Sequence, residues 1–168
     1  MTNNLSNNIP ITLIIYQVCQ DKGVKPLHAI ESGSRAWGFA SPDSDYDVRL
    51  IYRHEPDWYL GLYAGKDTFE FIQNDLFDVP FDIGGWDIRK ALQLLHKSNA
   101  VIFEWFNSPI MYHSDNQFLQ AIQAVQNEFF DPKAIFYHYQ GMAKNASGEL
   151  ELDKPIKLKN GFICFERC

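Results

Sequence analysis

Apolar side chains recur along the chain with two different periods, and the period changes near the middle. In the first half, residues 10–22 carry apolar positions at helical spacing, with Pro10 near the start and Gly23 after the end, which predicts a helix. Residues 27–32 and 45–52 predict two strands, the second from its alternating side-chain character. The segment between them is rich in Gly, Ser, Pro and Asp, which favours a turn with a short helical piece.

Two more strand candidates, residues 68–76 and 79–84, precede the change of period, and a hairpin would join them. From Trp86 the period becomes 3.6, which predicts an amphipathic helix over residues 86–97. Three further helices are expected at residues 100–107, 115–130 (with Asp115 as N-cap) and 132–146.

This order of elements predicts a core of strands and helices around a turn-rich loop, followed by a helical second half. We expect residues 10–84 to form the core and residues 85–150 a helical extension packed on it. Residues 151–168 would form a tail.

Composition narrows the class of protein without identifying it. The 168 residues suit one domain, and 46% hydrophobic with 15% aromatic residues is typical of a globular chain. A net charge of -6 disfavours a broad basic surface for nucleic acid but leaves room for a local basic patch. The three cysteines, Cys19, Cys164 and Cys168, have no metal-ligand spacing and predict reduced thiols in a cytoplasmic protein. Signal-peptide and membrane-span patterns are missing, so no membrane partner is expected.

Gly33 and Ser34 follow a predicted strand and precede the short helical piece. Glycine lets the backbone approach a ligand closely, and the backbone N–H groups and the serine hydroxyl suit a phosphate. Many proteins have such a turn, so this signal is weak when taken alone.

Asp45 and Asp47 stand two positions apart on a predicted strand, so both carboxylates would share one face. Like charges repel unless a cation lies between them, and Mg²⁺ prefers such oxygen ligands. Alternatively, the two acids belong to a polar turn at the start of the strand. Ten residues separate Ser34 from Asp45, so the turn and the acids would lie on neighbouring strands and face one triphosphate.

The whole pattern resembles a known signature. Gly33-Ser34, ten residues, then Asp45-Tyr46-Asp47-Val48 is similar to the motif of the DNA polymerase beta-like nucleotidyltransferase superfamily. The strings GSRAWGFASPDSDYDVR and GWDIRKALQLLHKSNAVIFEWFNSP resemble one branch, which holds bacterial nucleotidyltransferases and polymerase beta-like proteins associated with RNA repair. The resemblance covers about residues 10–150.

The resemblance implies an α+β fold: a mixed sheet with flanking helices and a helical C-terminal extension. It implies transfer of a nucleoside monophosphate from an NTP to an acceptor hydroxyl, with release of pyrophosphate. Gly33 and Ser34 would grip the β- and γ-phosphates. Asp45, Asp47 and a third acid, Asp82, would hold Mg²⁺ or Mn²⁺ in a two-metal scheme, and Asp82 would help to deprotonate the acceptor.

The sequence leaves several residue roles open. Asp87, at the first turn of a predicted helix, is the rival third acid. Arg35, Arg49 and Lys90 are candidates for phosphate contacts, and each is equally explained as a surface or loop-bracing residue.

Function is open in the same way. The resemblance stops after about Lys159, so we expect a shortened member of the family with its acids retained. The alternatives are a non-catalytic nucleotide-binding module, a truncated inactive member, and a plain α/β domain with a fortuitous motif. The acceptor, whether a nucleic acid end, a protein or a small molecule, cannot be predicted from these residues.

Overall fold

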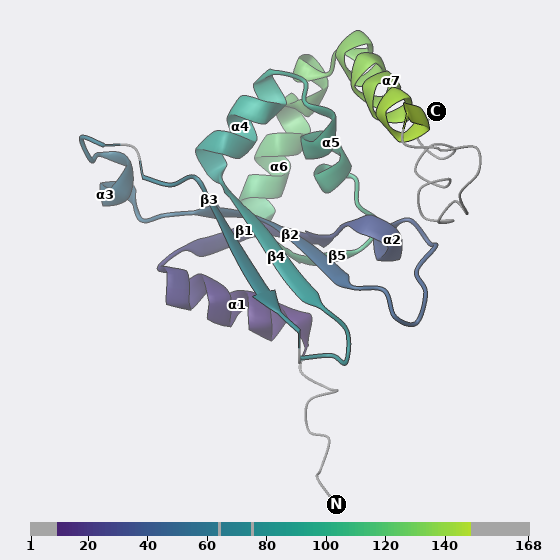
Figure 1. Ribbon diagram of the computed structural model, residues 1–168. Coiled ribbons are helices and arrows are strands. Elements are labelled where there is room, and N and C mark those ends of the chain that lie inside the picture. Colours follow the sequence, from purple (N-terminus) through teal and green to yellow (C-terminus); the bar gives the residue numbers. More distant parts are fainter. Residues whose placement is uncertain (1–9, 64, 75, 149–168) are drawn as a thin grey trace, which may run out of the picture.

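Five strands form one mixed sheet in the order β3-β4-β2-β1-β5 (Figure 1). The computed structural model describes residues 10–63, 65–74 and 76–148. In chain order, its elements are α1 (Ile11–Lys22), β1 (Lys25–Glu31), α2 (Gly33–Ala36), β2 (Tyr46–Arg53), α3 (Pro56–Tyr59), β3 (Thr68–Gln73), β4 (Phe81–Asp87), α4 (Ile88–His96), α5 (Ala100–Phe106), β5 (Met111–Ser114), α6 (Asn116–Val125), the 3₁₀ helix η2 (Gln126–Phe129) and α7 (Pro132–Gly148). The pair β2–β4 is parallel and the other neighbours are antiparallel. This mixed sheet with flanking helices confirms the expected α+β fold.

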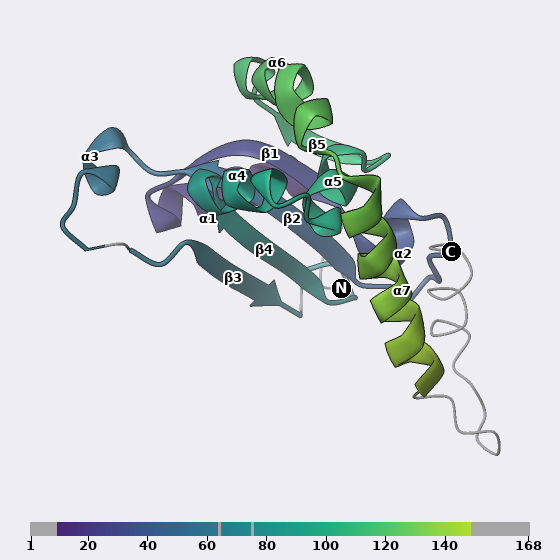
Figure 2. The same cartoon turned by 90° about the horizontal axis from the view of Figure 1, so that it is seen from above.

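The alternation of β2 sends its side chains into two separate cores. Val48, Leu50 and Tyr52 are buried with α1 on one face of the sheet. Ile51 is buried on the opposite face, in the core that α4, α5 and α6 build. Figures 1 and 2 show α1 on one side of the sheet and α4, α5 and α6 on the other. At the far end of the chain, α7 is tied to α5 by the Tyr139 hydroxyl, which donates to Glu104 Oε1 over 2.8 Å.

Most predicted elements of the first half are confirmed within one or two residues. The first helix ends at Gly23, which adopts the left-handed conformation with φ 66°. The two strand candidates that precede Trp86 pair as the antiparallel β3 and β4. The expected N-cap of α6 is also confirmed, because Asp115 Oδ1 accepts the N–H of Phe118 over 2.9 Å.

The predicted boundary between strand and helix near Trp86 is wrong. β4 continues to Asp87, and α4 begins only at Ile88, because the Asp87 side chain caps that helix. The second half is also not purely helical, since β5 pairs with β1. The predicted helix over residues 115–130 is divided between α6 and η2.

The division at residue 84 stays a prediction, although β4 runs through it. The predicted tail, residues 151–168 with Cys164 and Cys168, lies outside the described residues. Cys19 is buried in α1, and burial raises the pKa of its thiol to about 12. Of the helices in the described ranges, none combines the length and apolar character that a bilayer crossing requires.

Candidate functional site

Gly33 opens α2 immediately after β1 and lies against a carboxylate of β2. Its φ of +63° is in the left-handed region, which glycine adopts at little cost. A Cβ at this position would collide with Asp47 Oδ2. The turn and one of the predicted acids are therefore in direct contact, as the motif requires.

Asp47 and Asp82 are register partners on the parallel strands β2 and β4. Neighbouring strands lie about 4.8 Å apart, so the two carboxylates stand side by side on the face of the sheet that carries α4. Their side chains are 24% and 30% exposed, which leaves them open to solvent at the edge where β1 ends and β2 and β4 begin. The sheet thus brings together two of the three predicted acids.

Arg49 lies between these carboxylates. Its Nη1 donates to Asp82 Oδ2 over 2.8 Å, and its Nη2 is 3.3 Å from Asp47 Oδ1. The cation offsets the repulsion that two adjacent carboxylates would otherwise feel. Sequence reasoning named Arg49 as a possible phosphate contact, and its observed partners are the acids.

Two polar atoms near this edge have no hydrogen-bond partner. Ser34 is 5% exposed and its buried Oγ is unpaired, and Asp82 Oδ1 is buried and unpaired as well. An unsatisfied buried polar atom costs about 1–3 kcal/mol, so both atoms suit a ligand that supplies the missing bond. A hydroxyl donor fits a phosphate oxygen, and a carboxylate oxygen fits a cation or a proton donor.

Asp45 lies one residue before β2, rather than on the strand as expected. The loop around it is braced by Arg35, whose Nε donates to the carbonyl of Asp45 over 2.9 Å and whose Nη2 donates to the carbonyl of Ser44 over 2.6 Å. The Arg35 guanidinium also stacks 3.9 Å over the Tyr46 ring. These contacts favour the loop-bracing role for Arg35, and its contact with a nucleotide stays a prediction.

Three acids are not gathered into one centre. Across residues 10–63, 65–74 and 76–148, no set of three or more His, Cys, Asp and Glu side chains is arranged to hold a metal ion. The donor chemistry of Asp47 and Asp82 fits a divalent cation, but Arg49 lies between them. A metal bound to Asp45, Asp47 and Asp82 therefore stays a prediction.

Asp87, the rival third acid, has a different role. It is fully buried, and its Oδ1 accepts the Arg89 N–H over 2.9 Å as the cap of α4. Its Oδ2 accepts the Tyr59 hydroxyl over 2.8 Å. It stands five positions beyond Asp82 on β4, roughly 16 Å away along the strand. The geometry favours Asp82 over Asp87 as the partner of Asp47.

Lys90 is not brought to the acids. Its Nζ lies 3.7 Å from Asp67 Oδ1, and the Asp67 carbonyl accepts the N–H of Asp87. Lys90 is thus anchored near the end of β4 that is far from Asp82. The late start of α4 explains this position, because the lysine follows a longer strand than expected.

Glu31 is the residue of this edge that sequence reasoning missed. It is fully buried at the end of β1, where Oε1 accepts the N–H of Asp47 over 2.9 Å and Oε2 accepts the Tyr112 hydroxyl over 2.7 Å. Burial raises the pKa of this carboxyl, although the two hydrogen bonds act in the opposite direction and lower it. Glu31 holds the Asp47 backbone in place, and an acid that ends an apolar strand directly before the Gly-Ser turn was the available signal.

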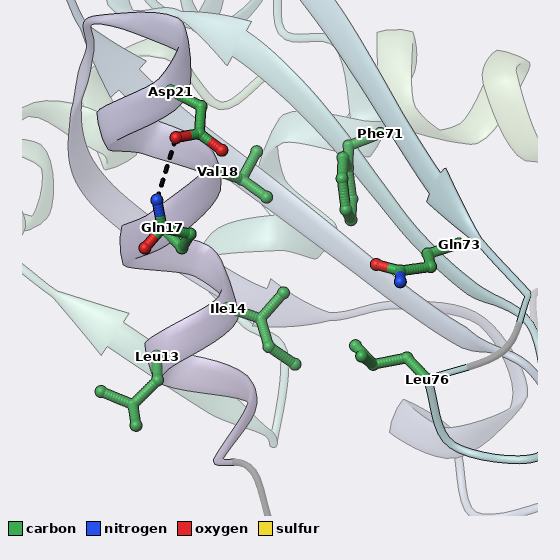
Figure 3. Close-up of a pocket in the computed structure, with 8 residues that line it drawn as sticks. All are labelled: Leu13, Ile14, Gln17, Val18, Asp21, Phe71, Gln73 and Leu76. Atoms are coloured by element: carbon green, nitrogen blue, oxygen red, sulfur yellow. Dashed lines mark hydrogen bonds between the residues drawn. The ribbon is translucent and has the colours of Figure 1, made fainter. Parts of the chain in front are cut away.

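A separate cavity lies on the other face of the sheet. It has a volume of about 480 Å³ and is formed between α1 and β3 (Figure 3). Most of its lining is apolar, including Leu13, Ile14 and Phe71. Because Asp47 and Asp82 face the opposite side of the sheet, this cavity is not part of the candidate site.

The match to a protein-family model agrees with the motif. The model of the RNA repair pathway DNA polymerase beta family matches residues 11–165. The uncharacterized protein YcgL of Bacillus subtilis (strain 168) is 41% identical over 143 residues, which cover 85% of this chain and 54% of that protein. The chain therefore spans about half the length of this relative. A nucleotidyltransferase-like protein from Exiguobacterium sibiricum 255-15 has a similar structure, with a TM-score of 0.44 and 8% sequence identity over 82% of this chain and 48% of that one.

Proposed function

Because the chain belongs to the RNA repair pathway DNA polymerase beta family, we propose that it is a nucleotidyltransferase. It would transfer a nucleoside monophosphate from an NTP to an acceptor hydroxyl. The observation that carries the proposal is the contact of Gly33 with the Asp47 carboxylate, beside the partner carboxylate of Asp82. Residues from the β1–α2 turn, β2 and β4 thus meet at one edge of the sheet.

In this proposal, the backbone at Gly33 and the unpaired hydroxyl of Ser34 bind the β- and γ-phosphates. Asp47 and Asp82, with Asp45 nearby in sequence, would hold a divalent cation, which would supply positive charge beside the phosphates. The chain contributes mainly position and charge, as is usual in phosphoryl-transfer chemistry.

The proposed reaction forms one bond at the α-phosphorus and breaks another. The acceptor hydroxyl oxygen forms a bond to the α-phosphorus, and the bond from that phosphorus to the oxygen bridging to the β-phosphate breaks. Pyrophosphate leaves with the bonding electrons. The hydroxyl proton passes to the Asp82 carboxylate.

Label transfer tests the proposal. The protein is incubated with cell extract, Mn²⁺ and an NTP labelled at either the α- or the γ-phosphate. The α-label is expected on an acceptor and the γ-label in pyrophosphate. Asp47→Asn and Asp82→Asn should abolish transfer, whereas Asp57→Asn, in α3, should not. Transfer of the γ-label, or of no label, contradicts nucleotidyl transfer.

A nucleotide-binding module without transfer is the second candidate. Two observations favour it: Arg49 already offsets part of the charge of the two carboxylates, and the described acids form no three-residue metal centre. Saturable NTP binding with no movement of either label would identify this module. Cytoplasmic location remains an expectation.

A further inference from the structure

Arg49 is held in the position that a cation would take between Asp47 and Asp82. We propose that Arg49 is an exchangeable cation: it offsets part of the charge of the two carboxylates in the metal-free chain, and a divalent cation binds by displacing it. The inference rests on the proposed function, because it concerns the same acids. It adds a residue that sets the metal affinity of the site.

The charges support an exchange. Two carboxylates and one guanidinium leave one negative charge, whereas a divalent cation would neutralise the pair completely. A divalent cation that bound the two carboxylates while Arg49 remained would lie close to the positive guanidinium. At an effective dielectric constant of 20, two unit charges at 4 Å interact by about 4 kcal/mol, so the two cations compete rather than coexist.

The contacts of Arg49 differ in strength on its two sides. Its 2.8 Å bond to Asp82 is well within the range for N–H···O bonds, whereas its 3.3 Å approach to Asp47 is beyond the usual upper limit of about 3.2 Å. The side chain is 25% exposed. The guanidinium can therefore leave toward solvent without crossing the core.

Gly84 provides the space in which Arg49 lies. The two residues are register partners on β2 and β4, and a Cβ at Gly84 would come within 2.8 Å of Arg49 Nη1. The atom that it would meet is the far end of a flexible side chain, so the backbone need not move. Gly84→Ala would therefore push the guanidinium away from Asp82 while it preserves every charge in the chain.

These relations define an experiment on metal binding alone. Mn²⁺ affinity is measured by electron paramagnetic resonance, without nucleotide, for the full chain and its Arg49→Gln and Gly84→Ala variants. We expect Arg49→Gln to bind Mn²⁺ about tenfold more tightly or better, which corresponds to 1.4 kcal/mol. Gly84→Ala should bind more tightly too, by a smaller factor.

The matched control is Arg53→Gln, which removes the same charge from the same strand. Arg53 pairs in register with Lys25 at the other end of β2, away from the acids. Its affinity for Mn²⁺ should equal that of the unchanged chain. A gain in Arg53→Gln as large as in Arg49→Gln would mean that net charge, not displacement, controls binding, and would overturn the proposal.

Thermal unfolding covers the case in which Arg49→Gln folds poorly. Without its cation, the carboxylate pair repels, so this variant should melt at a lower temperature than the unchanged chain and gain more from added Mn²⁺. Equal or weaker Mn²⁺ binding by both Arg49→Gln and Gly84→Ala overturns the proposal. Mn²⁺ binding is measured without nucleotidyl transfer, so the two proposals can fail separately. Label transfer together with unchanged Mn²⁺ affinities would contradict only the displacement of Arg49. Tighter Mn²⁺ binding without label transfer would contradict only the proposed enzyme activity.

Discussion

At the residue scale, the site depends on a glycine that leaves room for a carboxylate. Gly33 and Gly23 have nearly the same left-handed φ, +63° and +66°, but only the first faces a neighbour. Alanine at either position should cost about 1–2 kcal/mol of stability, because a side chain disfavours that conformation.

Only Gly33→Ala should also weaken binding of a non-hydrolysable NTP, by about tenfold or more. The new Cβ would displace the Asp47 side chain and so separate the Gly33-Ser34 turn from this carboxylate. Denaturant unfolding and calorimetric titration of both variants measure the two effects. If Gly33→Ala bound the NTP as tightly as Gly23→Ala, the contact would not matter for binding.

His28 supplies a pH-dependent contribution away from the site. Its Nε2 donates to the Trp105 carbonyl over 3.3 Å, so the neutral ring leaves Nδ1 to accept from the Ser114 hydroxyl over 3.1 Å. Burial lowers the pKa of this ring below its ordinary value of 6.5. The unfolded chain therefore takes up a proton more readily than the folded one, and stability falls as the pH drops below about 6.5.

His28→Gln should lose this part of the pH dependence. Urea unfolding of both proteins between pH 5 and 7.5 is the measurement, and the slope of the free energy of unfolding should be smaller in the variant. Parallel curves would show that another group carries the dependence.

The sequence predicted only in part which acidic residues lie close together in the structure. The motif pointed to Gly33 and Asp47, and the structure brings them into contact. The choice between Asp82 and Asp87 needed the register of β4 with β2, which no local pattern contains. Glu31 was missed for a similar reason, because its partners Asp47 and Tyr112 come from two other strands.

At the element scale, N-cap residues that can be recognised in the sequence determine where helices begin. Asp115 begins α6 by accepting the Phe118 N–H. Asp115→Ala should lower the free energy of unfolding by about 1 kcal/mol, because one N–H at the helix start loses its partner. Asp115→Asn keeps an acceptor and should stay close to the original stability. Equal losses in the two variants, measured by urea unfolding, would exclude the cap as the cause.

Elements were predictable where their own residues determine them. The first helix, β1 and β2 follow from period and turn residues. The predicted strand ended too early because Gly84 and Gly85 interrupt the alternation of β4. In the structure, the side chains of Arg49 and Phe69 come within 2.8 Å of the positions that a Cβ would take at these two glycines. β5 has four residues and owes its strand conformation to pairing with the distant β1, so its own pattern did not indicate it.

At the scale of the whole molecule, the sheet joins the two halves of the chain. β4 passes through residue 84, β5 pairs with β1, and α4, α5 and α6 cover one face. A chain cut after residue 84 loses the end of β4 and leaves that face open, so it should not unfold cooperatively. Circular dichroism during urea unfolding compares it with the full chain. A sharp transition in the shortened chain would support an independent core over residues 10–84.

The central claim is that one edge of the sheet holds a triphosphate between a Gly-Ser turn and a pair of carboxylates. A crystal structure of the chain with a non-hydrolysable NTP and Mn²⁺ tests it most directly. The account predicts phosphate oxygens against Gly33 and Ser34, a cation on Asp47 and Asp82, and Arg49 moved away from both. A nucleotide bound elsewhere, with Arg49 still bridging the two acids, would contradict it.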